Sequence, residues 1–451
     1  MKKTRLIISF LLTIIVFLGA GVACGPDDGS DGESIGKESN GKETEQVYNP
    51  DKKSPYKTED VTKENSMWDT EELFKTVPET EKVNVNMGKN LTLFKFTSVG
   101  YPRENKDITK VYACVGVPET EMPQGGYPAV VLVHGGAGQI YRDWVKYWND
   151  RGYVAIAYDT YSNGLKTVSG TPQKVKNPDG GPTETYTGSL KDDPTDYKNS
   201  WLYHGVANAI LCNNLLRARQ DVNSTQIGMT GISWGSVITL VTSGIDKRFN
   251  AFAPVYGAGY LYDDSFWLAA DKQATFGGEG KLNEWIERYD PSSYLPYSTK
   301  PTLFVSGVED NCFAFMNRKK SAGLIKGKAF YSQRNDLGHG HSWNKTEEIY
   351  CFFEHVLRGK NSIPIINGAK VENGTITLDA PNATFEGVYL TYTESYDGDS
   401  HKWIFAKEEI EKQGDKYAVG LPEKTTAYVV ETEYEYEGRT AHFSSPMYVV
   451  S

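Results

Sequence analysis

Short, uninterrupted apolar runs in the middle of the sequence place the strongest constraint on the fold. The runs 129–133 (AVVLV) and 154–158 (VAIAY) have no polar face, which is typical of strands buried on both sides in a parallel sheet. Segments whose apolar residues have helical spacing separate such runs. We expect strands at 129–133, 154–158, 227–230, 249–255, 301–307 and 328–334, and helices at 144–151, 201–220, 236–242 and 346–357. This alternation predicts the α/β class, with a mostly parallel sheet and helices on both faces.

The chain of 451 residues is long enough for two or three domains, at roughly 150 residues each. Residues 83–118 have the pattern of strands separated by turns, and we expect them to join the sheet in antiparallel orientation. After residue 360 short alternating strands, such as 387–392 and 427–431, predict a small antiparallel β-sandwich. We predict four parts: a signal segment at 1–24, an acidic, disordered tether at 25–65, an α/β domain at 66–360 and a β-sandwich module at 361–451.

The N-terminus has the features of an export signal. Lys2, Lys3 and Arg5 precede an apolar run at 6–18 and a small-residue stretch that ends before Cys24. Cys24 in this position resembles the lipidated cysteine of a bacterial lipoprotein. The resemblance implies an exported protein anchored to the cell surface by a lipid. A plain secretory signal and an uncleaved membrane anchor are the alternatives.

Charge and cysteine content exclude some classes of partner and cofactor. The formal net charge of −10 argues against nucleic-acid binding, which needs a basic surface. Besides Cys24 the chain has four cysteines, at 114, 212, 312 and 351, and two disulfides could join them in three pairings. Cys114 and Cys212 lie in apolar runs, so we favour buried free thiols. We expect no metal site and no cofactor.

A pentapeptide, Gly231-Ile232-Ser233-Trp234-Gly235, lies between the predicted strand 227–230 and the helix 236–242. In this context G-x-S-x-G is a nucleophile elbow, a tight turn that exposes the serine hydroxyl above the sheet. A serine hydroxyl is a weak nucleophile and needs a general base, which an acid orients. The sequence therefore predicts Ser233 as a nucleophile with an acid and a histidine after it.

Asp310 follows the strand 301–307 and is the favoured orienting acid, with Glu309 beside it as the alternative. Asp246 and Asp290 come too early in the strand order and are expected to be solvated or capping groups.

Two histidines compete for the role of base. His339 and His341 both follow the last strand of the predicted sheet, and an extended backbone would point them in opposite directions. We favour His339 because it comes first and has glycine on both sides. His341 is the alternative base.

A glycine-rich loop, His134 to Gly138, follows the strand 129–133 directly. Backbone N–H groups of such a loop can hold the oxyanion of a tetrahedral intermediate. We expect the oxyanion donors to be Trp234 and either Gly136 or Ala137. No Gly-Lys-Ser/Thr follows, which disfavours a nucleotide site.

These motifs resemble the α/β-hydrolase superfamily over roughly residues 83–360, and more closely bacterial acetyl xylan esterase and dienelactone-hydrolase-like proteins. The resemblance is carried by residues 134–138, 144–159, 231–236 and 337–343. It implies a Ser233–His339–Asp310 triad that hydrolyses acyl esters, for which acetyl esters of a carbohydrate or a related small substrate are the expectation. An exported serine peptidase of the prolyl oligopeptidase type is the alternative. Dienelactone hydrolases proper use cysteine where this chain has Ser233.

Two features allow more than one interpretation. Residues 257–291 contain aromatic side chains that stack against sugar rings or form the core of a lid. The β-sandwich module is either a binding module or a packing domain that shapes the cleft, and we favour packing because no site chemistry is visible in it. The acyl group, the alcohol and the oligomeric state are left open.

Overall fold

The computed structural model describes residues 66–168, 171–183, 188–263, 265–268, 276, 280–381, 383–394 and 404–450. The predicted signal segment with Cys24 and the predicted tether lie outside these residues. In the described part of the chain no helix is both long and apolar enough to cross a membrane.

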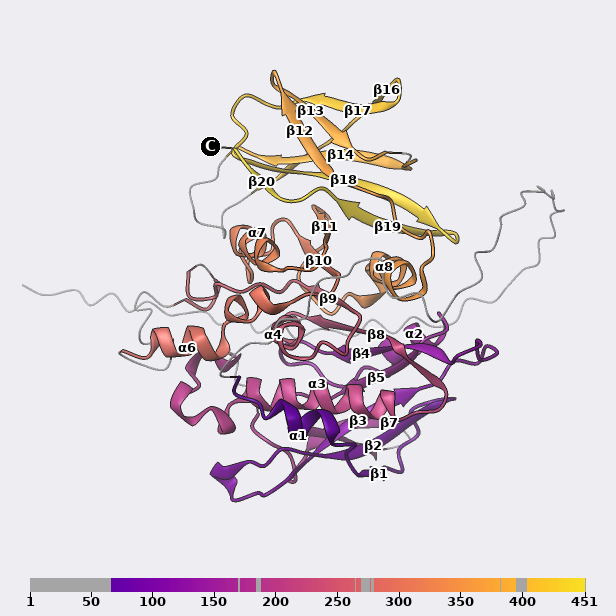
Figure 1. Ribbon diagram of the computed structural model, residues 1–451, viewed down its shortest axis with the longest axis vertical. Helices are drawn as coiled ribbons and strands as arrows, with labels where there is room; N and C mark the ends of the chain where they lie inside the picture. Colours follow the sequence, from indigo (N-terminus) through magenta and orange to yellow (C-terminus); the bar gives the residue numbers. More distant parts are fainter. Residues whose placement is uncertain are drawn as a thin grey trace, which may run out of the picture. The chain divides into compact units, whose positions relative to one another are not determined.

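A nine-stranded sheet forms the centre of the α/β part, in the order β1-β2-β3-β5-β4-β8-β9-β10-β11 (Figure 1). The bounds are β1 (Thr80–Lys82), β2 (Leu91–Ser98), β3 (Thr109–Gly116), β4 (Tyr127–Val133), β5 (Val154–Tyr158), β8 (Val222–Ile232), β9 (Ala251–Val255), β10 (Thr302–Gly307) and β11 (Ala329–Arg334). β1, β2, β3 and β5 pair antiparallel in that order, whereas β5, β4, β8, β9, β10 and β11 pair parallel in that order. The carboxyl ends of the parallel strands therefore meet at one edge, where ligand sites of such sheets lie.

Helices cover both faces of this sheet (Figure 1). They are α1 (Thr70–Lys75), α2 (Arg142–Asn149), α3 (Trp201–Arg217), α4 (Trp234–Ile245), α6 (Leu282–Tyr289), α7 (Phe315–Leu324) and α8 (Glu347–Arg358). In β8 the backbone of Gly228 lies against the ring of Phe353 in α8, while Gly231 lies against Thr239 in α4. Residues three apart in a strand face opposite sides, so α8 and α4 cover opposite faces.

The fold class agrees with the sequence prediction. The run 154–158 coincides with β5, and every predicted strand of the parallel sheet is present. The bounds differ most at β8, which begins at Val222 rather than at 227, because the added residues 223–226 are polar and hide the strand.

Several elements were not predicted. The insertion after β5 contains a hairpin of β6 (Asn163–Val168) and β7 (Thr171–Lys176), and α7 follows the loop after β10. The inward face of α7 is largely polar: Asn317, Arg318 and Ser321 are buried and hydrogen-bonded there. An apolar periodicity was therefore absent from its sequence.

The C-terminal residues form two further sheets. One has the order β12-β13-β17-β16, and the other contains β15, β14, β18 and β19, with β20 paired to β18. The bounds are β12 (Gly368–Glu372), β13 (Thr375–Asp379), β14 (Gly387–Thr393), β15 (Ala406–Glu409), β16 (Lys412–Gln413), β17 (Lys416–Gly420), β18 (Ala427–Tyr436), β19 (Arg439–Ser444) and β20 (Tyr448–Val449). A cluster that includes Ile376, Leu390 and Val430 joins the two sheets. This is the expected small β-sandwich.

Within the described residues, Cys114, Cys212, Cys312 and Cys351 are free thiols. Cys114, Cys212 and Cys351 are buried, as the apolar surroundings of the first two predicted.

Candidate active site

Ser233 occupies a strained turn between β8 and α4. Its backbone has φ 55° and ψ −120°, a conformation that non-glycine residues rarely adopt. A Cβ at Gly231 would collide with the carbonyl of Gly235, and one at Gly235 would collide with the carbonyl of Val133. The two glycines therefore permit the turn, which brings the serine hydroxyl to the carboxyl edge of the sheet.

The structure brings Ser233, His339 and Asp310 into one hydrogen-bonded chain. The Oγ atom of Ser233 lies 2.9 Å from Nε2 of His339, and Nδ1 of His339 lies 2.8 Å from Oδ2 of Asp310. With Asp310 accepting from Nδ1–H, Nε2 is the acceptor for the serine proton. This arrangement can activate the hydroxyl for attack on a carbonyl.

Asp310 is held by the loop that follows β10. Its Oδ1 atom accepts hydrogen bonds from the N–H groups of Cys312 and Phe313, at 2.8 and 3.0 Å. These bonds leave Oδ2 for the histidine. Glu309, the alternative acid, is exposed and its Oε1 atom accepts instead from the N–H of Phe405, so it lies outside the chain of bonds.

Arg318 supports the same loop and was missed in the sequence. It is fully buried, and its guanidinium donates to the carbonyls of Gly307 (2.7 Å) and Val308 (3.2 Å) and to Oε1 of Gln333 (2.7 Å). Burial lowers the pKa of Arg318 to about 10, so it stays charged at neutral pH. Its place in a polar segment without periodicity offered no signal.

Aromatic rings fix the imidazole of His339. The ring of Tyr256 lies 4.5 Å from it, centroid to centroid, and Phe313 stacks at 6.2 Å. The Tyr256 hydroxyl donates to the carbonyl of Gly338 at 2.7 Å, which ties down the residue before the histidine. Tyr256 directly follows β9. Its position at the carboxyl edge of the sheet was the one signal in the sequence that could have indicated a role at the site.

His341 makes a different hydrogen bond from that of His339. Its Nε2 atom accepts a hydrogen bond from the N–H of Gly135 at 2.9 Å. Burial, together with nearby His134 and His339, lowers the pKa of His341 to about 4, so the ring is neutral and can accept this bond at neutral pH. Of the two candidate bases, the geometry pairs only His339 with Ser233.

The glycine-rich loop lies beside the elbow. A Cβ at Gly136 would be 3.1 Å from Cδ1 of Trp234 and 3.4 Å from the hydroxyl of Tyr161. The N–H of Trp234 belongs to the first turn of α4, where no intrahelical acceptor exists. The N–H of Ala137 donates to the Tyr161 hydroxyl at 3.0 Å. Of the two loop residues considered as oxyanion donors, Ala137 is therefore engaged elsewhere and Gly136 is the better placed.

His134 stabilises this loop. Its Nε2 atom accepts from the N–H of Thr160 at 3.1 Å, its Nδ1 atom lies 2.9 Å from the carbonyl of Gly135, and Asp159 approaches within 3.7 Å. The ring also stacks on Tyr161 at 5.4 Å.

Aromatic residues surround the nucleophile. Trp267 lies 4.7 Å from Trp234 and 5.2 Å from Phe313, ring centre to ring centre, and Trp201 lies 6.0 Å from Trp234. Trp285, in the same aromatic insertion as Trp267, is fully buried and packs as core. The insertion thus contributes both core and a wall close to Ser233.

Among the described residues, one group has spacing compatible with a metal ion: Asp310, Cys312 and His339, whose donor atoms lie within 4.8 Å of one another. Both ring nitrogens of His339 are already hydrogen-bonded. Burial and the Asp310 charge raise the pKa of the Cys312 thiol to about 12, which disfavours the thiolate that a metal needs. The hydrogen bonds among Ser233, His339 and Asp310 are those of a proton-transfer chain rather than of a metal site.

Comparison with known proteins assigns the family. The sequence profile of the acetyl xylan esterase (AXE1) family matches residues 54–286, which is more than half of the chain and includes the elbow, though not Asp310 or His339. Comparison with curated protein sequences finds no match.

Solved structures share the fold. An acetyl xylan esterase from a Paenibacillus species has a TM-score of 0.51 and 18% identity, covering 67% of this chain and 98% of its own. Acetyl xylan esterase 1 from a Thermoanaerobacterium species has a TM-score of 0.47 and 15% identity, covering 66% and 96%. An acylaminoacyl peptidase from Pyrococcus horikoshii has a TM-score of 0.42 and 17% identity, covering 63% and 42%. At 18% identity the likeness to the Paenibacillus structure concerns the fold alone, so the family assignment depends on the profile. The chain belongs to the acetyl xylan esterase family and is a serine hydrolase of the carboxylic ester class.

Proposed function

We propose that this chain is an exported carboxylesterase that removes short acyl groups, acetyl above all, from a carbohydrate or a related small substrate. The observation that carries the proposal is the continuous chain of hydrogen bonds from Ser233 through His339 to Asp310, built on a strained elbow. Membership of the acetyl xylan esterase family supports the choice of an ester substrate.

The proposed reaction proceeds through an acyl-enzyme. Ser233 attacks the ester carbonyl while His339 accepts its proton at Nε2, and Asp310 stabilises the imidazolium that forms. The N–H groups of Trp234 and Gly136 hold the oxyanion. Collapse of the tetrahedral intermediate breaks the bond to the alcohol, which leaves with the proton from His339. Water activated by the same imidazole then releases the acid. No step requires a metal or an organic cofactor.

The preference for a short acyl group follows from the aromatic wall. Trp234, Trp267 and Phe313 pack against one another close to the nucleophile, and Ser233 itself is only 8% exposed. We expect these large rigid rings to limit the space for a long acyl chain. Trp234 and Phe313 are buried, so of these three rings Trp267, which is partly exposed, is the one that offers an apolar face to the sugar that carries the ester.

Export and lipid anchoring are proposed from the sequence. The basic N-terminus, the apolar run 6–18 and Cys24 support a lipoprotein signal. In a bacterial host, Cys24→Ala is expected to abolish incorporation of radiolabelled fatty acid. Unchanged labelling would contradict lipidation at Cys24, and release of unlabelled wild type into the medium would support a plain secretory signal.

One experiment tests the function. Ser233→Ala is expected to lower hydrolysis of p-nitrophenyl acetate by ~10⁴–10⁶ and to abolish labelling by a fluorophosphonate probe. Ser243→Ala is the matched control, because Ser243 is a buried serine of α4 whose hydroxyl donates to the carbonyl of Leu240. Near wild-type turnover in Ser233→Ala would contradict the assignment. Acetylated xylo-oligosaccharides compared with aminoacyl-p-nitroanilides then distinguish an esterase from the alternative, a peptidase.

A further inference from the structure

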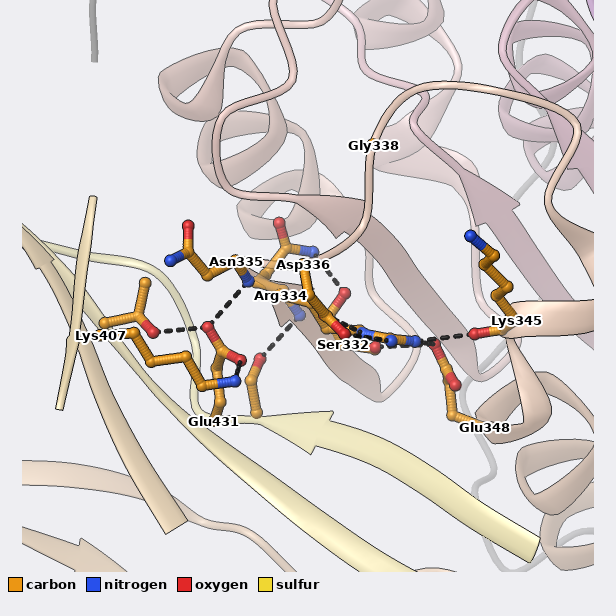
Figure 2. Close-up of polar contacts among 12 residues, drawn as sticks. Ser332, Arg334, Asn335, Asp336, Gly338, Lys345, Glu348, Lys407 and Glu431 are labelled. Atoms are coloured by element: carbon orange, nitrogen blue, oxygen red, sulfur yellow. Dashed lines mark hydrogen bonds and ion pairs between the residues drawn. The ribbon is translucent and has the colours of Figure 1, made fainter. Parts of the chain in front are cut away.

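The β-sandwich contacts both loops that carry the proposed acid and base. Glu309, beside Asp310, accepts a hydrogen bond from the N–H of Phe405 at 2.8 Å. The N–H of Asn335, four residues before His339, donates to Oε1 of Glu431 in β18 at 2.9 Å (Figure 2). The β-sandwich has no recognisable catalytic residues of its own. It nevertheless contacts the two loops whose positions determine the geometry of the proposed triad.

The geometry of the sheet explains why the module attaches here. β11 is the last strand of the nine-stranded sheet, and its outer edge would otherwise present unpaired N–H groups. Two N–H groups, two residues apart, are bonded by side chains of the sandwich. Gln333 donates to Oγ of Ser444 at 3.1 Å, and Asn335 donates to Glu431. The sandwich thus covers the edge strand directly before the loop of His339.

Glu431 is built for this contact. Its side chain is buried, with 2% of the residue exposed, yet the carboxylate is well bonded. Oε1 also accepts from the Thr391 hydroxyl, and Oε2 pairs with Nζ of Lys407 at 2.9 Å (Figure 2). Burying a carboxylate is costly without such partners, and Thr391 and Lys407 fix it in one orientation toward Asn335.

The histidine loop, 335–338, is also held from the α/β part, where Leu337 is buried in the core. Arg334 binds Asp336 through two hydrogen bonds of 2.9 and 3.0 Å, and Tyr256 binds the carbonyl of Gly338. Both of these come from the α/β part itself. Glu431 provides the tie at the start of the loop, and it comes from the sandwich.

We propose that the β-sandwich positions the catalytic base, with Glu431 as the positioning residue that holds the start of the His339 loop. The proposal rests on the proposed function, since it assumes that His339 is the base. Glu431 does not touch the reacting atoms; its effect reaches Ser233 through the distance between Oγ and Nε2. Small displacements of a catalytic group cost much in turnover and little in substrate binding.

The test compares two substitutions of Glu431 in the full chain. Glu431→Leu removes the acceptor, and we expect kcat for p-nitrophenyl acetate to fall about tenfold to a hundredfold while KM stays within about twofold. Glu431→Gln keeps an amide oxygen for Asn335, and we expect it to retain kcat within about threefold. Glu433→Leu is the matched control, because Glu433 lies on the same strand and bonds to Tyr389 of the sandwich; its kcat should equal that of wild type. A wild-type kcat in Glu431→Leu, or an equal loss in Glu431→Gln, would overturn the proposal.

A second variant covers the case in which Glu431→Leu does not fold. Ser444→Ala removes one hydroxyl from the same edge contact, and we expect a severalfold lower kcat with an unchanged KM and a folded protein. Wild-type kcat in that variant would then overturn the proposal.

Fluorophosphonate labelling distinguishes failure of the proposed function from failure of the positioning role. A wild-type chain that neither reacts with the probe nor hydrolyses the ester contradicts the proposed function, whereas an active wild type with an equally active Glu431→Leu contradicts only the positioning role.

Discussion

The ring of His341 accepts a hydrogen bond from the backbone N–H of Gly135, 206 residues earlier in the chain, at 2.9 Å. This bond connects the loop of the proposed base to the loop of the proposed oxyanion site. His339, two residues away, makes the contact with Ser233 at the same distance. Two neighbouring histidines therefore have different partners and should respond differently to substitution.

Replacing each histidine should separate these roles. His339→Ala is expected to lower kcat by ~10⁴ or more, because Ser233 loses its proton acceptor. His341→Ala should lower it only about tenfold, because Gly135 loses a hydrogen-bond acceptor while the proton-transfer chain is intact. Steady-state hydrolysis of p-nitrophenyl acetate measures both. Equal losses in the two variants would refute this division.

The lowered pKa of His341 predicts a pH dependence of stability. The folded pKa of about 4 lies below the ordinary value of 6.5, so between these values the unfolded chain binds more protons. The His341 contribution to the free energy of unfolding is therefore full above about pH 6.5 and is lost as the pH falls toward 4.

Other buried groups titrate in the same range, so a comparison of variants is needed. The pKa values of His204 and His442 are also lowered to about 4 by burial, and act in the same direction, whereas burial raises the pKa of Asp192 to about 7, which acts in the opposite direction. His341→Gln cannot titrate and keeps an oxygen for Gly135. Urea unfolding from pH 7 to pH 4.5 should show a shallower decline in this variant than in wild type, and parallel curves would show that His341 makes no contribution.

Tyr161 should matter through its hydroxyl. In Tyr161→Phe the N–H of Ala137, an exposed residue, loses its acceptor and can bond water instead, so we expect a loss of no more than about 1 kcal/mol in the free energy of unfolding and a severalfold lower kcat because the loop beside Gly136 loosens. Tyr153→Phe is the control, because its hydroxyl loses a buried hydrogen bond to Glu354 on the α8 side of the sheet, away from Ser233. For Tyr161→Phe we expect kcat to fall with little change in denaturant unfolding, whereas Tyr153→Phe should lose stability with its kcat retained.

The elbow should not tolerate a side chain at Gly235. A Cβ there would collide with the carbonyls of Val133 and His134, so Gly235→Ala is expected to lower the free energy of unfolding by about 1–3 kcal/mol and to reduce activity. Gly323→Ala in α7 meets no atom within 4 Å and should be neutral or gain up to about 1 kcal/mol from helix propensity. Thermal unfolding distinguishes the two; a neutral Gly235→Ala would mean that the turn has more space than its backbone contacts indicate.

Local patterns made the central elements predictable. A strand buried on both faces must be apolar throughout, so 154–158 was visible as β5 without knowledge of its neighbours. The elbow was predictable for a similar reason, since Gly231 and Gly235 reflect contacts within a few residues of Ser233 and against the adjacent strand. Segments with polar buried faces, such as α7, were invisible because hydrogen bonds replace apolar packing there.

The amino-acid sequence by itself determined the α/β class, the strained turn at Ser233 and the short set of residues from which an acid and a base could come, because these depend on residue type and near spacing. Only the tertiary structure paired His339, rather than His341, with Ser233, joined Ala137 to Tyr161 by a hydrogen bond, and placed Arg318, Tyr256 and Glu431 next to the loops of the proposed triad. Each of these choices depends on hydrogen bonds or ring contacts between residues that are distant in the chain and meet only when the sheet and its loops have formed.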